Sequence, residues 1–139
     1  MLGDLWSFQG RYRTLHLTWI AFFLTFVVWF NLAPLATTVK ADLGLTVGQI
    51  RTVAICNVAL TIPARVLIGM LLDKFGPRIT YSSILVFSAI PCLLFASAQD
   101  FNQLVVARLL LSIVGAGFVI GIRMVAEWFP PKEIGLAEG

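Results

Sequence analysis

Four long apolar stretches, separated by short polar segments, make up most of this chain. They cover about residues 15–37, 47–72, 79–98 and 103–129. Each is close to the roughly 20 apolar residues that an α-helix needs to cross the hydrocarbon core of a bilayer. In lipid, a helix satisfies all of its own backbone hydrogen bonds. The sequence therefore predicts an all-α membrane protein with four transmembrane helices in the lipid bilayer.

The composition agrees with this prediction and differs from that of a soluble domain. Of the 139 residues, 59% are hydrophobic and 12% are charged, whereas soluble domains are about 45–50% apolar and about 25% charged. The length leaves no room for a soluble domain beside four helices. The net charge of +3 is spread along loops and helix ends and forms no basic patch, so no nucleic-acid partner is expected.

The distribution of basic residues predicts the topology. Segment 1–14, the loop between the second and third stretches and the C-terminal tail carry more lysine and arginine than the opposite side, which has Lys40 and Arg51. Basic loops favour the cytoplasmic side. We therefore expect a multi-pass protein of the inner (plasma) membrane with residues 1–14 in the cytoplasm. Pro34 is expected to bend the first helix, and residues 130–139 to form a loop toward a fifth span.

Arg65 lies inside the second apolar stretch. A charge near the bilayer centre costs roughly 2.5–3.5 kcal/mol on insertion scales, and such residues usually face a polar cavity or a partner. A guanidinium offers paired donors in one plane, which suits a small planar anion. The alternative is a structural arginine that pairs with helix carbonyls or extends toward the membrane surface.

Segment 69–78, between the second and third stretches, reads G-M-L-L-D-K-F-G-P-R. Gly69 is expected to let a neighbouring helix approach closely. Gly76 is expected to supply a turn conformation that other residues resist.

The charged residues of this segment are expected to interact with helix ends. Asp73 is suited to face a helix N-terminus, while Lys74 and Arg78 are suited to pair with carboxylates near the cytoplasmic ends of neighbouring helices. Glu127, near the inner end of the fourth stretch, is one such carboxylate. The alternative is an ordinary charged turn that only holds the topology.

The same segment resembles the signature G-x-L-x-D-(R/K)-x-G-x-(R/K) of the major facilitator superfamily, at the loop where that family carries it. Further matches are F-N-L-A-P-L at 30–35, I-P-A-R at 62–65 and the run at 121–139. Together these segments are similar to the nitrate/nitrite porter family within the superfamily. The resemblance covers about residues 15–139 and implies a twelve-helix transporter, of which this chain is an N-terminal fragment with four helices.

The resemblance also implies roles for individual residues. In the family, an arginine of the second helix binds nitrate with a symmetry-related arginine of the other half, and Arg65 matches the first. A family aromatic in the fourth helix stacks on the planar anion, and Phe118 matches it by its distance from the end of that helix. The alternative for Phe118 is a ring that packs or faces lipid. In the superfamily the signature charges latch the two halves in the outward-facing state, and the resemblance implies the same role here.

Other polar positions have simpler explanations. Arg123 and Glu127 are four residues apart on one helix face and are expected to neutralise each other. Asn57 could hydrogen-bond substrate, but a bond to another helix is the preferred expectation. For Arg108, extension toward the helix end and a functional role are both open. Small-residue spacing predicts close helix packing at three glycines of the fourth stretch: Gly115, Gly117 and Gly121.

The sequence contains no metal-ligand spacing, nucleophile–base pair or phosphate-binding loop, so we expect no metal, cofactor or enzymatic activity. The complete protein is expected to move nitrate, nitrite or both by alternating access, with its site near the midplane. The chain alone, without the missing C-terminal helices, is expected to be inactive. The alternatives are a major facilitator transporter of another small anion, and a non-transporting membrane sensor or vestigial product.

Overall fold

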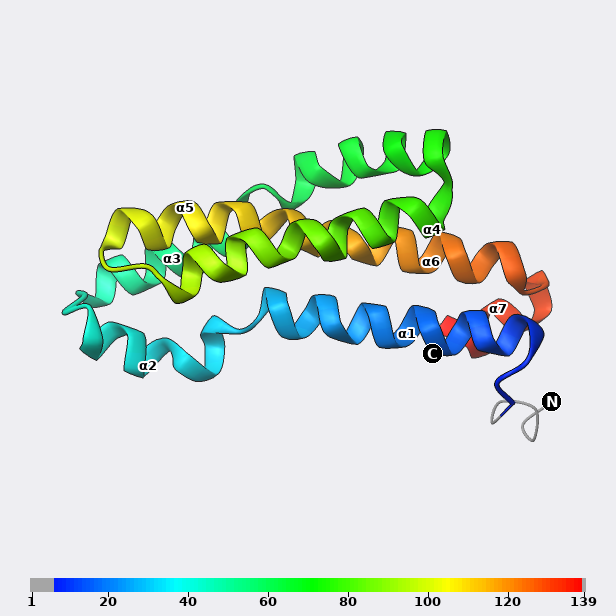
Figure 1. Ribbon diagram of the computed structural model, residues 1–139, viewed down its shortest axis with the longest axis horizontal. Helices are drawn as coiled ribbons and strands as arrows, with labels where there is room; N and C mark the ends of the chain where they lie inside the picture. Colours follow the sequence, from blue (N-terminus) through cyan, green and yellow to red (C-terminus); the bar gives the residue numbers. More distant parts are fainter. Residues whose placement is uncertain (1–6, 139) are drawn as a thin grey trace.

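A computed structural model describes residues 7–138, so the first six residues of the predicted N-terminal segment and Gly139 lie outside the described part. The described residues form α-helices and short turns and contain no strand, which confirms the all-α prediction (Figure 1). The helices are α1 (Gly10–Trp29), α2 (Leu32–Asp42), α3 (Val47–Ala59), α4 (Thr61–Ala96), α5 (Phe101–Ser112), α6 (Gly117–Trp128) and α7 (Pro131–Glu138), and a 3-10 helix (Ile113–Ala116) joins α5 to α6.

Among residues 7–138, three helical runs are long and apolar enough to cross a membrane: Gly10–Asp42, Val47–Ala96 and Phe101–Trp128. The second run contains two arms, because α4 has a non-helical residue, Gly76, at φ 78° and ψ 166°. The chain reverses there, and the second arm of α4 returns alongside the bundle (Figure 1). Three runs therefore supply the four membrane-length helices that the sequence predicts.

Two of these helices are broken near their middle, one turn before a proline. Pro34 has no N–H to donate to the carbonyl of Phe30, and the chain leaves the helix at Phe30, where Ala33 N bonds to Phe30 O at 3.0 Å instead. Pro63 likewise cannot bond to Ala59, and α3 ends at that residue. The first break therefore lies one turn before the predicted bend at Pro34.

The C-terminal residues 131–138 form α7, where the sequence predicted a loop. Pro131 occupies the first helical position, where its missing N–H costs nothing. Glu133 lies in the first turn and forms an ion pair with Arg11, in which Oε2 of Glu133 is 2.9 Å from Nη1 of Arg11. The loop prediction was wrong because these start signals also suit a short helix, which packs on α6 and is joined to α1 by the Arg11–Glu133 ion pair.

Close packing at two glycines joins α1 to the 3-10 helix and to the start of α6. A Cβ on Gly115 would lie 2.7 Å from Cζ2 of Trp29, and one on Gly117 would lie 3.3 Å from Cγ2 of Thr25. The same test at Gly121 gives 3.8 Å, an ordinary contact. The expected tight packing is confirmed at the first two glycines. The largest core cluster draws on both arms of α4, on α5 and α6 and on the turn between them: Ala64, Ile68, Leu72, Tyr81, Ile84, Leu111, Val114, Ala116 and Ile120.

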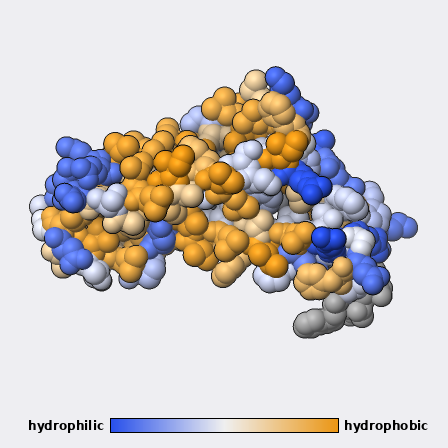
Figure 2. All heavy atoms as spheres, in the orientation of Figure 1, coloured by the Kyte–Doolittle hydropathy of each residue, from blue (hydrophilic) through white to orange (hydrophobic). Residues whose placement is uncertain are grey.

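Much of the outer surface is apolar, as Figure 2 shows. Ile62, Val86 and Leu93 are exposed by 76%, 75% and 71%. An apolar surface this extensive is suited to contact with lipid or with further helices and is unusual for a soluble monomer. It agrees with a multi-pass membrane protein.

Replacing Gly76 by alanine is expected to destabilise the fold, because its backbone conformation is costly for a residue with a Cβ. The cost is about 1–3 kcal/mol, and a lower melting temperature of the purified complete gene product in detergent would report it. Gly69→Ala is the matched control, since Gly69 lies within the helical first arm and its added Cβ would meet nothing within 4 Å. Equal melting temperatures for the two variants would contradict the role of Gly76.

Candidate functional site

Arg65 and Phe118, the two residues that the resemblance assigns to the anion, lie next to each other. Arg65 comes from the first arm of α4, and Phe118 from the first turn of α6. The guanidinium carbon of Arg65 is 6.0 Å from the centroid of the Phe118 ring. Both side chains are exposed on the described part of the protein, Phe118 by 43%. The fold therefore brings a cation and an aromatic face to one accessible place.

The guanidinium of Arg65 has no ion pair and no side-chain hydrogen bond within residues 7–138. Its interaction is with the ring of Phe118, and cation–π contacts of this kind contribute about 0.5–1 kcal/mol at exposed sites. Among the described residues it makes no bond to a helix carbonyl, which was the structural alternative. Its donors are therefore not used by any described residue.

Aromatic rings of α1 continue from Phe118. The ring centroid of Phe22 is 5.8 Å from that of Phe118, and the ring of Phe26 follows at 4.6 Å from Phe22. A small cavity of about 120 Å³ lies beside Phe118 between α1, α6 and α7, and Phe22 and Gly121 are among its lining residues. The neighbourhood of Phe118 thus offers flat apolar faces and an arginine, and the cavity lining also includes Thr18 and Glu138.

The signature segment forms the reversal between the two arms of α4. Gly76 has a positive φ, as the sequence predicted, and its carbonyl accepts a hydrogen bond from Thr80 Oγ1 at 2.8 Å. The charged residues Asp73, Lys74 and Arg78 are exposed. Within residues 7–138 none of the three has an ion pair.

Two expectations about this segment differ from the structure. Gly69 has open space around it, because the face of the first arm that carries it does not meet another described helix. Glu127 pairs with Arg123, with Nε and Oε1 3.0 Å apart, as expected for that helix pair. The carboxylate of Glu127 is thus occupied within its own helix and does not contact Lys74 or Arg78 here.

Arg108 is the charged residue whose environment the sequence did not reveal. It is fully buried, with 0% of its surface exposed, so it does not extend toward the helix end. Its Nη1 donates to Asn57 Oδ1 at 3.2 Å and to Trp29 O at 3.4 Å, and its Nη2 donates to Asn31 Oδ1. The guanidinium carbon also lies 4.1 Å from the centroid of the Phe95 ring.

The partners of Arg108 lie at the helix breaks. The carbonyl of Trp29 lacks its helical partner, because Ala33 N bonds to Phe30 O and not to Trp29 O. Asn57 lies in the last turn of α3, where backbone carbonyls also lack a helical partner. Asn57 O accepts from Trp29 Nε1 at 2.7 Å. The expected bond between Asn57 and another helix is thus confirmed.

A third helix interruption joins the same network. Leu60 N donates to Ser112 Oγ at 3.2 Å, and Thr61 Oγ1 donates to Ser112 O at 2.9 Å. Ser112 is the last residue of α5 before the 3-10 helix. We call the set Trp29, Asn31, Asn57, Arg108 and Ser112 the polar joint. Two asparagines and an arginine inside apolar stretches were the sequence signal that could have revealed it.

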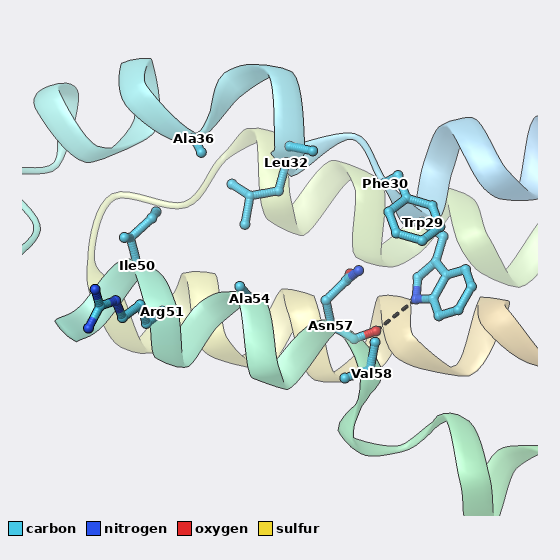
Figure 3. A pocket seen from close by; sticks show the side chains of 10 residues that line it. Trp29, Phe30, Leu32, Ala36, Ile50, Arg51, Ala54, Asn57 and Val58 are labelled. Carbon is cyan, nitrogen blue, oxygen red and sulfur yellow. Dashed lines mark hydrogen bonds between the residues drawn. The ribbon is translucent and has the colours of Figure 1, made fainter. Parts of the chain in front are cut away.

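A larger cavity of about 370 Å³ lies between α2 and α3 (Figure 3). Its lining is mostly apolar and includes Leu32, Ala36 and Ala54. The polar side chains in its lining are Arg51 and Asn57, at opposite ends in the view of Figure 3. Within the described residues no group of three or more histidine, cysteine, aspartate or glutamate side chains could hold a metal ion.

Comparison with known proteins confirms the family resemblance. Residues 18–139 match the model of the Major Facilitator Superfamily. The chain is 68% identical, over its whole length, to the nitrate/nitrite transporter NrtP of Picosynechococcus sp. and to that of Nostoc punctiforme, and it spans 26% and 28% of those proteins. It is 33% identical, over 93% of its length, to the probable nitrate/nitrite antiporter NarK1 of Thermus thermophilus, of which it spans 29%. No solved structure matches.

The chain therefore spans about a quarter of the length of these curated relatives. Its helices, its signature segment and its relatives agree with one another. The chain belongs to the major facilitator superfamily and is related there to nitrate/nitrite transporters.

Proposed function

We propose that this chain is part of a transporter that moves nitrate, nitrite or both across the membrane by alternating access. The observation that carries the proposal is the Arg65 guanidinium, free of protein anions within residues 7–138 and 6.0 Å from the Phe118 ring. The relationship to nitrate/nitrite transporters supports the choice of anion. The function is binding and conformational change, with no covalent step.

In this proposal Arg65 neutralises the anion and Phe118 lies against its flat face. Nitrate and nitrite are planar, singly charged and weakly basic, so they need donors in one plane and no titrating base. The guanidinium fork donates to two oxygens together, and the ring supplies an apolar face. One arginine exposed to hydrocarbon would be costly, so the site needs walls from helices beyond those described here.

Those walls are proposed to come from further helices of the complete transporter. The chain corresponds in length to about a quarter of its relatives, and its exposed apolar surface leaves room for them (Figure 2). With residues 1–14 in the cytoplasm of the plasma membrane, the signature turn at Gly76 also faces inward. The exposed charges of Asp73, Lys74 and Arg78 are then free to latch onto the other half, while Glu127 contributes through its pair with Arg123.

Arg65→Lys in the complete gene product is expected to lower nitrate uptake into proteoliposomes strongly. Lysine keeps the charge but loses the planar fork, and a lost hydrogen bond to a charged group costs about 1.5–3 kcal/mol, or roughly 10- to 100-fold in kcat/KM. Arg13→Lys is the matched control, because Arg13 is an exposed residue near the start of α1 that has no part in the proposed site. Unchanged uptake by the Arg65 variant would contradict the site.

Phe118→Leu is expected to raise the KM for nitrate, whereas Phe118→Tyr, which keeps a ring, is expected to change it little. Aromatic contacts contribute about 0.5–1.5 kcal/mol beyond burial, which corresponds to roughly 3- to 10-fold. Phe23→Leu serves as the control, since Phe23 is a 59% exposed ring of α1. If the leucine variants of both positions had the same KM as the unmodified protein, Phe118 would be only a packing residue.

A further inference from the structure

The larger cavity is lined by a second group of side chains suited to binding an anion. It lies between α2 and α3, with the exposed Arg51 near the start of α3 and Asn57 in the last turn of α3, next to Trp29 (Figure 3). None of its lining residues is acidic. At about 30 Å³ for each water, its volume of about 370 Å³ has room for a small ion and several waters.

The buried Arg108 determines which way the amide of Asn57 is turned. A guanidinium has only donors, so the atom of Asn57 that faces it at 3.2 Å must be the carbonyl oxygen Oδ1. The NH₂ group of Asn57 makes no hydrogen bond within residues 7–138, and Asn57 lines the cavity. The donor end of the amide is therefore the end left for a ligand in the cavity, and the charged bond behind it polarises the amide.

The two polar lining residues differ in how they would act on an ion. Arg51 is exposed and has no ion pair within residues 7–138, so its charge acts on ions in solution and is screened by salt. Asn57 is 8% exposed and fixed by Arg108, so it acts at short range. The indole of Trp29 and the ring of Phe30, both in the lining, add flat faces for a planar ion.

We propose that this cavity is an outer receiving site for a small planar anion, distinct from the site at Arg65. Arg51 attracts the anion at the mouth, the NH₂ of Asn57 donates to it, and Arg108 is a positioning residue that holds the Asn57 amide in the donating orientation. The inference rests on the proposed transport function and on the outward orientation of the end of the bundle that carries Arg51. The anion occupies this cavity before it reaches Arg65.

Asn57→Asp in the complete gene product is the sharpest test. Aspartate has the same size and still accepts a hydrogen bond from Arg108, but it offers no donor and repels anions. We expect the KM for external nitrate in right-side-out vesicles to rise at least tenfold, while kcat for uptake and the KM for internal nitrate stay within about twofold. An unchanged external KM, or an equal rise in the KM on both sides, would overturn the proposal.

Arg51→Gln tests the mouth of the cavity. We expect its external KM to rise about three- to fivefold at low ionic strength and to approach the unmodified value at high salt, because the attraction is screened. Lys40→Gln is the matched control: it removes a positive charge on α2, at the same end of the bundle, that does not line the cavity. Equal effects of the two variants would show a general surface charge and overturn the role of Arg51.

Arg108→Lys tests the positioning role. A lysine has no planar fork with which to donate to both Asn31 and Asn57. We therefore expect a higher external KM with little change in kcat. The double variant with Asn57→Asp should be no worse than Asn57→Asp alone, because both changes remove the same donor. Additive losses would contradict positioning through Asn57. If Arg108→Lys does not reach the membrane, the Asn57 and Arg51 variants still decide the question.

These outcomes separate the receiving site from the proposed function. If the unmodified protein moves no nitrate, or if Arg65→Lys leaves uptake unchanged, the proposed function itself fails. If uptake depends on Arg65 while the Asn57 and Arg51 variants keep the unmodified external KM, the transport proposal stands and the receiving site does not exist.

Discussion

Inside an apolar bundle, every break in a helix leaves backbone groups that water cannot satisfy, and each such group costs several kcal/mol. Here the breaks after Trp29 and Ala59 and the 3-10 turn after Ser112 lie together and satisfy one another. Arg108 supplies donors to three oxygens in this region, and Trp29 and Ser112 supply the rest. The bent helices depend on this polar joint, and the cavity between α2 and α3 exists because the helices bend there.

Two arginines within the apolar stretches illustrate opposite solutions to the cost of a charge in this environment. Arg108 has 0% exposure, three oxygen acceptors and the Phe95 ring beside it, so the protein itself satisfies most of its donors. Arg65 is exposed, lies 6.0 Å from the Phe118 ring and has no ion pair within residues 7–138. The first is therefore suited to hold structure, while the second is suited to bind something that comes and goes.

The sequence predicted much of this arrangement because periodic apolar length and glycine chemistry are local properties. The four stretches, the turn at Gly76 and the Arg123–Glu127 pair follow from neighbours in the chain and agree with the structure. The juxtaposition of Arg65 and Phe118 was implied only through the family resemblance, since it joins distant segments. The bend expected from Pro34 occurs at Phe30, because a proline disrupts the bond to the residue four positions earlier.

Other features depended on tertiary context that no local pattern reports. The burial of Arg108 requires three helix breaks at one level, which only the packed bundle shows. The helix at Pro131–Glu138 is held by Arg11, far away in the chain. Gly69 was predicted to let a neighbouring helix approach closely, but the face that carries it meets no described helix.

The most direct test of the account is a high-resolution map of the complete gene product with bound nitrate, recorded by cryo-electron microscopy. The account predicts planar density within hydrogen-bonding distance of the Arg65 guanidinium and against the ring of Phe118, absent from a map recorded without the anion. A guanidinium of Arg65 that faces lipid, or that is locked to a protein carboxylate in both maps, would contradict it.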